Sequence, residues 1–335
     1  MTDFWKDSPE LATTLERVAL LMRDAVRGND FPLEEAVGAI VESNGKMLRP
    51  AFLVLGSRFG KKGSVERVLP LAASIELLHV STLIHDDVID ESDLRRGVPT
   101  LHTRFGVKDA VLAGDWLFAR CFQLAAASAS PEHAQALARL ICAICAAEIR
   151  QDLDKWSYSP SLRAYHRKIA GKTAALFSLA LHVGATEAKA PNRVAERLRR
   201  AGYDIGMAFQ IIDDILDFES TEGVMRKPVG HDVAEGLCTL PLIHALRADE
   251  AGMRALLARL PRPGAARAGA AGASATAEAV AAILARSAEL GGLDAARRDA
   301  ERYTRRAQAA IDGLPAGAAR DDLSRLTAKL LSRSY

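Results

Sequence analysis

Apolar residues recur at the three- and four-residue spacing of an α-helix along nearly the whole chain, with short breaks between the repeats. The first repeat shows the pattern clearly, at Leu11, Leu15, Val18 and Met22. Gly28 and the two residues after it interrupt that stripe. No part of the chain shows the strand–helix alternation of an α/β protein or the paired runs of a hairpin. The periodicity therefore predicts an all-α protein, folded as a single large helical bundle.

The breaks divide the chain into successive helical segments. We expect helices at residues 11–27, 33–43, 50–59, 65–91, 108–128, 131–153, 162–184, 193–218, 238–247, 276–289, 293–314 and 321–331. A single domain is expected over residues 1–335, with a motif-bearing core at about 33–247. The Gly/Ala-rich segment 261–275 is expected to be a flexible linker.

Composition narrows the possible classes of function. Hydrophobic residues make up 49% of the chain and aromatic residues only 5%, which favours helices over strands. The net charge of +2 gives no electrostatic case for binding nucleic acid. The N-terminus lacks the apolar region of a signal peptide, and no uninterrupted apolar run approaches the ~18 residues of a membrane span. We therefore expect a soluble, cytoplasmic protein without a transmembrane segment.

Four cysteines occur in the sequence, and they form no metal-binding or disulfide framework. Cys142 and Cys145 form a C-x-x-C pair, but it lies in an apolar run and has no second pair or nearby histidine. The pattern predicts thiols that are buried on a helix face.

A cluster of acidic residues lies near the end of the helix expected at residues 65–91. Asp86, Asp87 and Asp90 share an arc of about 100° with Glu76 and His79. An acidic helix end in solvent would be the simpler interpretation, but the surrounding residues are apolar. Carboxylates crowded in such a setting raise one another's pKa unless a cation is present.

A second copy of the acidic motif follows 127 residues later. Asp213, Asp214 and Asp217 share one helix face with Gln210, and apolar residues again surround them. Oxygen ligands without a histidine or cysteine set suit Mg²⁺, which binds through a few carboxylates and substrate phosphates. Together the two motifs predict facing acidic walls that hold a diphosphate through metal ions.

Basic residues stand in a turn before a helix, shortly after each acidic motif, and within an otherwise apolar helix. They are Lys46, Arg49, Arg95, Arg96, Lys172 and Lys227. A single basic residue in a loop is usually solvated, but arginine suits bidentate contact with phosphate and lysine supplies a point charge. The set as a whole indicates a site for anionic substrates.

With these motifs, the chain resembles the trans-polyprenyl diphosphate synthases, the long-chain type of class I isoprenoid synthases. The resemblance rests on residues 45–50, 76–79, 86–90, 95–97, 114–115, 148–151, 171–173, 209–217, 227–232 and 239–242, which follow the family's order. It implies a helical bundle with a deep central pocket and both aspartate motifs at its mouth. It also implies condensation of isopentenyl diphosphate with an allylic diphosphate, farnesyl or geranylgeranyl diphosphate, to give an all-trans polyprenyl diphosphate.

The resemblance implies a role for each matching residue. Three Mg²⁺ would be bound by Asp86, Asp87, Asp90, Asp213, Asp214 and Asp217. The leaving diphosphate would be held by Arg95, Lys172 and Lys227. The diphosphate of isopentenyl diphosphate would be held by Lys46, Arg49, His79 and Arg96. Thr173 and Gln210 would stabilise the allylic cation, and Gln151 is an expected neighbour of the pocket.

A homodimer is implied, a heteromer with a small second subunit stays open, and product release would involve peripheral membrane contact.

Product length is expected to depend on residues one helical turn before Asp86. One turn rises ~5.4 Å, which is close to the length of an isoprene unit. Ser81 and Thr82 are small, whereas short-chain members of the family often place bulky aromatics there. The sequence therefore predicts a medium-to-long product of about six or more isoprene units, with Phe118 and Phe122 as a possible deeper floor.

Three other functions are compatible with parts of the pattern. A short-chain synthase that stops at geranylgeranyl diphosphate shares every motif. A class I terpene cyclase shares the fold, but cyclases usually lack a second aspartate-rich motif of this kind. A non-catalytic partner subunit would be expected to have lost aspartates, and all six are present. The sequence departs from the resembled pattern at Met47 and Leu237, where basic residues are frequent.

Overall fold

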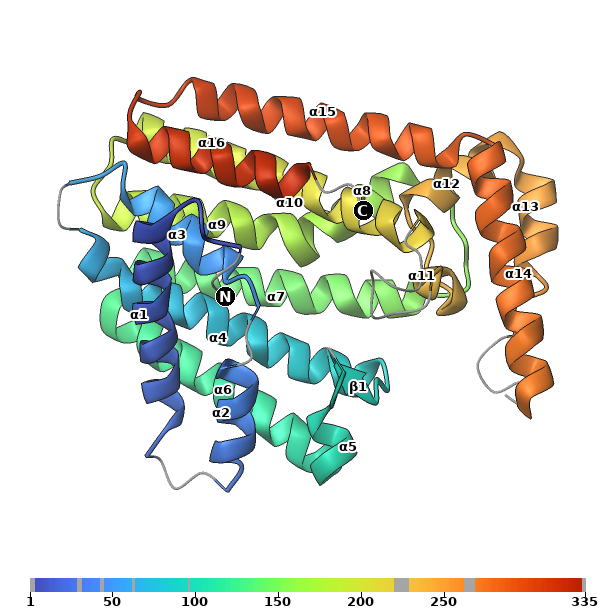
Figure 1. Cartoon of the computed structure of the whole chain (residues 1–335), viewed down its shortest axis with the longest axis horizontal. Coiled ribbons are helices and arrows are strands. Elements are labelled where there is room, and N and C mark those ends of the chain that lie inside the picture. The colour runs from blue at the N-terminus through green and yellow to red at the C-terminus, as the bar shows by residue number, and fades with distance from the viewer. Residues whose placement is uncertain are drawn as a thin grey trace. The chain divides into compact units, whose positions relative to one another are not determined.

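Helices carry nearly all of the regular structure in residues 4–28, 32–42, 45–61, 64–95, 97–219, 229–261 and 269–332, which the computed structural model describes (Figure 1). The first eight helices are α1 (Pro9–Val26), α2 (Glu34–Glu42), α3 (Leu48–Ser57), α4 (Val65–Ile89), α5 (Leu101–Phe105), α6 (Val107–Ser128), α7 (Pro131–Asp154) and α8 (Leu162–Ile169). The predicted all-α class is confirmed.

A π-helical turn, η1 (Ala170–Ala174), follows α8 directly. The remaining helices are α9 (Ala175–Glu187), α10 (Asn192–Glu219), α11 (His231–Ala234), α12 (Leu240–Ala248), α13 (Glu250–Leu257), α14 (Gly269–Glu289), α15 (Gly292–Asp312) and α16 (Ala318–Leu331). Polar side chains cap two of these helices: Ser161 accepts a hydrogen bond from the Ala164 amide, and Asp249 accepts one from Gly252.

The chain forms two compact units, each made from three separate segments. Unit 1 comprises Met1–Arg139, Leu176–Gly202 and Ala310–Arg325, and unit 2 comprises Leu140–Ala175, Tyr203–Ala309 and Leu326–Tyr335. The sequence predicted one domain over residues 1–335, and the structure distinguishes these two units within it.

The core of unit 1 is built around α3. Every residue of this helix except Arg49 is buried, and the Phe52 ring contacts Phe177 with a centroid distance of 5.2 Å. Helix α4 packs along α6 (Figure 1). Because α4 is enclosed for most of its length, its apolar sequence is satisfied within the unit.

The core of unit 2 has two apolar clusters. One surrounds Tyr165 and includes Ile211 and Ile243, and the other includes Leu242, Met253 and Ile283. The first cluster brings α8, η1, α10, α12 and α15 together. It therefore supports the part of α10 that carries the second aspartate motif.

Two local features differ from the sequence predictions. Leu94–Arg95 (β1) pairs antiparallel with Val98–Pro99 (β2), so the expectation of no hairpin was wrong. Gly97 adopts φ 81°, a conformation that suits the tight turn between these strands. The continuous helix expected at 162–184 is interrupted by η1, and π-turns of this kind occur often at functional sites.

The predicted burial of the C-x-x-C thiols was also wrong. Cys142 and Cys145 are exposed, because α7 turns its other face inward through Leu140, Ile141 and Ile144. Residues 269–275 of the segment expected to be flexible belong to α14. Residues 262–268 lie outside the described part of the chain.

Three helical stretches are long and apolar enough to cross a membrane by length and composition alone: Val65–Ile89, Val107–Ser128 and Leu162–Glu187. In each stretch the 18-residue segment that meets this criterion is partly buried within the protein, to 72%, 33% and 61% respectively. The criterion of an uninterrupted apolar run did not detect them, because polar residues interrupt each stretch. The absence of a transmembrane segment stays a prediction.

Candidate active site

The first aspartate motif lies at the C-terminal end of α4, in unit 1. Asp87 is buried, Asp86 is partly buried, and Asp90 is exposed and caps the helix. Ser92 donates its amide to the Asp87 carbonyl oxygen at 2.9 Å, so the chain turns back immediately after the helix. This turn leads into the β1–β2 ribbon, which returns Arg95 to the end of α4.

Arg95 forms a bidentate ion pair with Asp87. Its Nε lies 2.7 Å from Oδ1 and 2.9 Å from Oδ2 of the carboxylate, and its second guanidinium nitrogen lies 2.7 Å from Oδ1. The pair brings together a predicted metal ligand and a predicted ligand of the leaving diphosphate. Arg96, predicted to bind isopentenyl diphosphate, lies outside the described residues.

A glycine of α6 makes room for the imidazole that precedes the motif. A Cβ atom at Gly114 would lie 2.3 Å from Nε2 of His85, so a larger residue would require the imidazole to move. In this space His85 Nε2 lies 3.3 Å from the Val111 carbonyl oxygen and 3.4 Å from Asp115 Oδ1. The match at residues 114–115 thus has a packing reason, and His85 contacts α6.

The residues predicted to control product length lie one turn earlier on α4. Ser81 is fully buried, and its hydroxyl donates to the Gly114 carbonyl oxygen at 2.9 Å. Thr82 is partly buried and donates to the His79 carbonyl oxygen at 2.8 Å. Phe118 and Phe122 of α6 are partly buried and contact each other edge to face, with centroids 5.3 Å apart. Control of length stays a prediction.

The residues predicted to bind isopentenyl diphosphate also belong to unit 1. Lys46 is exposed, with its Nζ 5.0 Å from the Phe4 ring centroid, and Arg49 lies over the Phe177 ring at 5.7 Å. The Trp5 indole donates to the Lys46 carbonyl oxygen at 3.0 Å, which ties the N-terminal segment to this turn. His79 is partly buried on α4.

The second motif lies in the last turns of α10, in unit 2. Asp214 and Asp217 are buried, and Asp213 and Gln210 are partly buried. Gln210 donates from Nε2 to Asp214 Oδ1 at 3.0 Å, which confirms that the two share one helix face. The Tyr165 hydroxyl donates to Asp214 Oδ2 at 2.6 Å.

Asp217 is fixed by Gly230 and by the first turn of α11. The Asp232 amide donates to Asp217 Oδ2 at 3.1 Å, and the Gly230 amide donates to the Asp217 carbonyl oxygen at 2.7 Å. Lys227, expected just before this segment, lies outside the described residues.

Burial and mutual repulsion weaken the acidity of this motif. Burial raises the pKa of Asp214 to about 6, with a further contribution from the negative charge of Asp232. Burial and the Asp232 charge also raise the pKa of Asp217 to about 7. Burial, together with the Asp214 charge, raises the pKa of Tyr165 well above its usual value, so the phenol remains a proton donor. A cation placed here would offset the repulsion.

The π-turn η1 places Lys172 and Thr173 beside α10. A Cβ atom at Gly206 would lie 2.5 Å from the Ala174 Cα, so only glycine allows this approach. The Thr173 hydroxyl donates to Gln210 Oε1 at 2.7 Å, which joins two predicted catalytic residues. Lys172 forms an ion pair with Glu148 of α7 at 2.8 Å.

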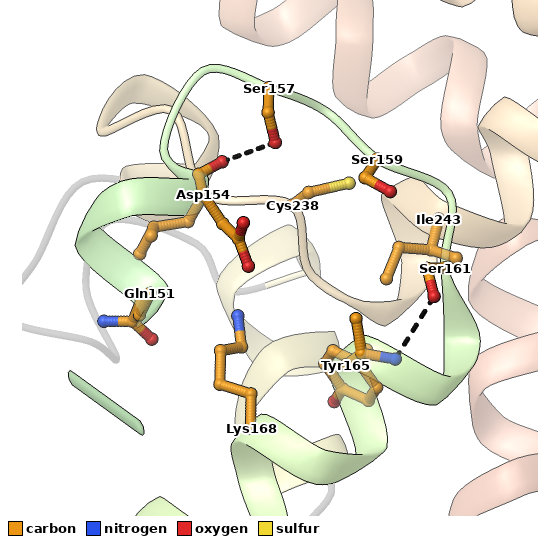
Figure 2. Close-up of a pocket in the computed structure, with 11 residues that line it drawn as sticks. Gln151, Asp154, Ser157, Ser159, Ser161, Tyr165, Lys168, Cys238 and Ile243 are labelled. Carbon is orange, nitrogen blue, oxygen red and sulfur yellow. Dashed lines mark hydrogen bonds between the residues drawn. The ribbon is translucent and has the colours of Figure 1, made fainter. Parts of the chain in front are cut away.

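A cavity lined partly by polar side chains adjoins the second motif in unit 2 (Figure 2). Its lining includes Gln151, Asp154, Tyr165, Lys168 and Cys238. Gln151, the predicted neighbour of the pocket, donates to Glu148 Oε2 at 3.4 Å and so stands beside the partner of Lys172.

The chemistry of the donors fits magnesium rather than a metal held by protein ligands alone. In the described ranges, no group of three or more His, Cys, Asp or Glu side chains is arranged to hold a metal ion. Mg²⁺ usually keeps several waters and is bound through one or two carboxylates together with substrate phosphates. The acidic groups of each motif match that mode of binding.

Comparison with known proteins places the chain in a family. The sequence model of the family described as "Polyprenyl synthetase" matches residues 31–270, well over half of the chain. The chain belongs to the polyprenyl synthetase family. The predicted family is therefore confirmed.

Relatives in the polyprenyl synthetase family align with nearly the full chain. Heptaprenyl diphosphate synthase component 2 of Geobacillus stearothermophilus is 36% identical, over 97% of this chain and 97% of that protein. A geranylgeranyl pyrophosphate synthase from Lactobacillus brevis has a TM-score of 0.89 at 34% identity, covering 99% of this chain and 100% of that chain. Heptaprenyl diphosphate synthase from Staphylococcus aureus has a TM-score of 0.88 at 31% identity, covering 96% and 98%.

Sequence reasoning assigned no role to three of the residues that contact the predicted site. Tyr165 lies 49 residues before Asp214, and no local spacing connects them. Glu148 and Asp232 lie within matched segments of the polyprenyl synthetase pattern. The available signal for Glu148 and Asp232 was an acidic side chain in a matched segment that also contains residues near the predicted site.

Proposed function

We propose that this prenyltransferase of the polyprenyl synthetase family condenses isopentenyl diphosphate with an allylic diphosphate in a magnesium-dependent reaction. The observation that carries the proposal is the second motif, where Asp214 and Asp217 are buried beside Asp232. Buried acidic groups in this arrangement call for cations, and a substrate diphosphate would complete the coordination of Mg²⁺. The first motif, with Asp87 paired to Arg95, supplies a second acidic group of the same type.

The proposed roles follow the chemistry of each side chain. Asp86, Asp87, Asp90, Asp213, Asp214 and Asp217 would bind three Mg²⁺. When bound, the metal ions neutralise the charge that develops on the departing allylic diphosphate. Arg95, Lys172 and Lys227 hold that diphosphate, and Lys46, Arg49, His79 and Arg96 hold isopentenyl diphosphate.

Ionisation of the allylic C1–O bond gives a cation that must be protected from water. The Thr173 hydroxyl and the Gln210 amide are joined by a hydrogen bond, so their oxygen dipoles are held in one orientation. We assign them to stabilising the allylic cation while the isopentenyl double bond attacks it. The resulting cation then loses a proton to the released diphosphate, which forms the new double bond and completes one cycle of elongation.

The proposed product is a medium- or long-chain all-trans polyprenyl diphosphate of about six or more isoprene units. The small side chains of Ser81 and Thr82 support this length, and so do the relatives named for heptaprenyl diphosphate. A geranylgeranyl product is the second candidate, favoured by the structural likeness to the Lactobacillus brevis enzyme.

For the assembly we propose a cytoplasmic homodimer that touches membranes peripherally during product release. Exposed apolar side chains on α7, with Ile149 at 62% and Leu153 at 77% exposure, support a protein partner. The relative named "component 2" supports the alternative of a second, different subunit. Light scattering of the purified chain separates a monomer from a dimer.

A product assay tests the proposed function. The purified chain is incubated with Mg²⁺, farnesyl diphosphate and labelled isopentenyl diphosphate, and the dephosphorylated products are sized by chromatography. Polyprenols of about six or more units are expected, and they should disappear after chelation and return with added Mg²⁺. Turnover that survives thorough chelation, or a complete lack of elongation with every allylic primer, contradicts the proposal for the chain acting alone.

A further inference from the structure

Asp214 is bound through both of its carboxylate oxygens. The Tyr165 hydroxyl donates to Oδ2 at 2.6 Å, and Gln210 Nε2 donates to Oδ1 at 3.0 Å. Both Tyr165 and Asp214 are at most 5% exposed, so water has little access to replace either bond. The orientation of this carboxylate is therefore determined by two protein donors.

The two donors belong to different parts of unit 2. Gln210 lies on α10 itself and is in turn bound by Thr173 of the π-turn, at 2.7 Å. Tyr165 reaches Asp214 from α8, seven residues before Lys172 in the sequence. A continuous chain of hydrogen bonds thus runs from Thr173 through Gln210 and Asp214 to Tyr165.

The Tyr165 ring lies among apolar side chains, and its hydroxyl makes the polar contact that orients it. One side of the ring packs in the apolar cluster that includes Ile169 and Ile211. Tyr165 also lines a cavity, together with Lys168, whose Nζ lies 5.7 Å from the ring centroid (Figure 2). The apolar cluster holds the ring, and the hydrogen bond to Asp214 gives its buried hydroxyl a charged partner.

We infer that Tyr165 is a positioning residue that holds Asp214 and so orients the acidic face of α10 toward the metal ions. The inference rests on the proposed function, because it concerns the same motif. Tyr165 does not touch the substrates in this account. It acts through Asp214, and Asp213 and Asp217 present their oxygens from the turn that Asp214 anchors.

The test compares Tyr165→Phe with the unchanged chain by metal binding rather than by turnover alone. Mn²⁺ binding is measured by electron paramagnetic resonance in the presence of a farnesyl thiodiphosphate, which is resistant to ionisation. Loss of one hydrogen bond to a charged group is expected to weaken Mn²⁺ binding about tenfold. The rate constant kcat should fall by a similar factor while KM for isopentenyl diphosphate stays unchanged.

Tyr158→Phe is the matched control. Tyr158 is also buried in unit 2 but belongs to the other apolar cluster, with Leu242 and Met253. This variant should bind Mn²⁺ like the unchanged chain, which separates a directed contact from general loosening of the unit.

A double-mutant cycle with Asp214→Asn supplies a second measurement. Removing the Tyr165 hydroxyl in that background should change Mn²⁺ binding less than twofold, because the two groups act as a pair. Independent, multiplying effects would overturn the inference. So would unchanged Mn²⁺ binding in Tyr165→Phe, or a variant that no longer folds, since the residue would then be structural.

The inference and the proposed function fail in different ways. If the unchanged chain neither elongates a primer nor binds Mn²⁺ with the thiodiphosphate, the proposed function fails. If the unchanged chain does both and Tyr165→Phe matches it, only the positioning role fails.

Discussion

The guanidinium of Arg95 binds both carboxylate oxygens of Asp87, with Nε 2.7 Å from Oδ1 and 2.9 Å from Oδ2. One residue of the pair lies at the end of α4 and the other on the β1–β2 ribbon. Because Asp87 is buried and the contact is bidentate, the pair fixes the ribbon against the helix. It therefore sets the direction of a cation that the family resemblance assigns to the leaving diphosphate.

Arg95→Lys keeps the positive charge but loses the planar fork that matches the carboxylate. We predict a fall of about 10- to 100-fold in kcat/KM for the allylic substrate, because the cation is no longer held in one direction. Steady-state kinetics with farnesyl diphosphate provide the measurement. Arg104→Lys is the control, since Arg104 is exposed and lies over the Phe105 ring. Equal rates for the two variants would refute the role of the fork.

Glu148 forms the ion pair that holds Lys172 at the π-turn, with a distance of 2.8 Å. Lys172→Gln removes a charge assigned to the leaving group, and kcat should fall about 100-fold. Glu148→Gln keeps Lys172 but removes this ion pair, and a smaller loss of about tenfold is expected. Lys155→Gln, which disrupts the pair with Asp152, is the control and should leave kcat unchanged. A Glu148→Gln enzyme as slow as Lys172→Gln would show that the carboxylate has its own role.

The raised pKa of Asp217, about 7, makes the stability of the metal-free protein depend on pH. An aspartate in an unfolded chain has a pKa of about 3.9, so folding favours the protonated form. This contribution to stability is present below about pH 4 and is lost as the pH rises through about 7. The thermal midpoint of the metal-free protein should therefore fall by several degrees between pH 5 and 8.

Asp217→Asn should flatten that decline, since an amide does not titrate. The exposed Asp294→Asn serves as the control and should keep the full slope. Mg²⁺ with inorganic diphosphate should raise the midpoint most above pH 7, where the carboxylates are ionised. Scanning calorimetry at constant ionic strength measures all three effects, and parallel slopes for Asp217→Asn and the unchanged chain would contradict the assignment.

Ser81→Phe combined with Thr82→Phe should shorten the product. Ser81 is fully buried and its hydroxyl donates to the Gly114 carbonyl oxygen, so a phenyl ring at this position must occupy volume beside α6. We expect a shift to products at least one isoprene unit shorter, measured by chromatography of the dephosphorylated chains. Thr82→Val removes a hydroxyl without adding bulk and should leave the length unchanged. An unaltered product length in the double variant would show that Ser81 and Thr82 do not control product length.

The helices were predictable because their apolar residues repeat locally. The expected segments 131–153 and 193–218 correspond to Pro131–Asp154 and Asn192–Glu219. Gln210 and Asp214 were likewise expected on one face, since the spacing of four residues requires it in any helix.

Contacts between distant segments had no such local signal. Nothing in the spacing connects Tyr165 with Asp214. The π-turn at Ala170–Ala174 contains Gly171, but one glycine does not distinguish such a turn from an ordinary helix. The ribbon at residues 94–99 was missed because two strands of two residues each are too short to show alternation. Exposure of Cys142 followed from the rotation of α7, which packing decides.

The central claim is that the buried acidic face of the second motif, held by Tyr165 and Gln210, binds metal ions that activate the substrate diphosphate. Anomalous diffraction at the manganese edge from crystals grown with Mn²⁺ and a farnesyl thiodiphosphate tests it most directly. The account predicts Mn²⁺ peaks within coordination distance of Asp213 or Asp217, in contact with the diphosphate. A diphosphate bound without metal, or metal peaks that avoid this motif, would contradict it.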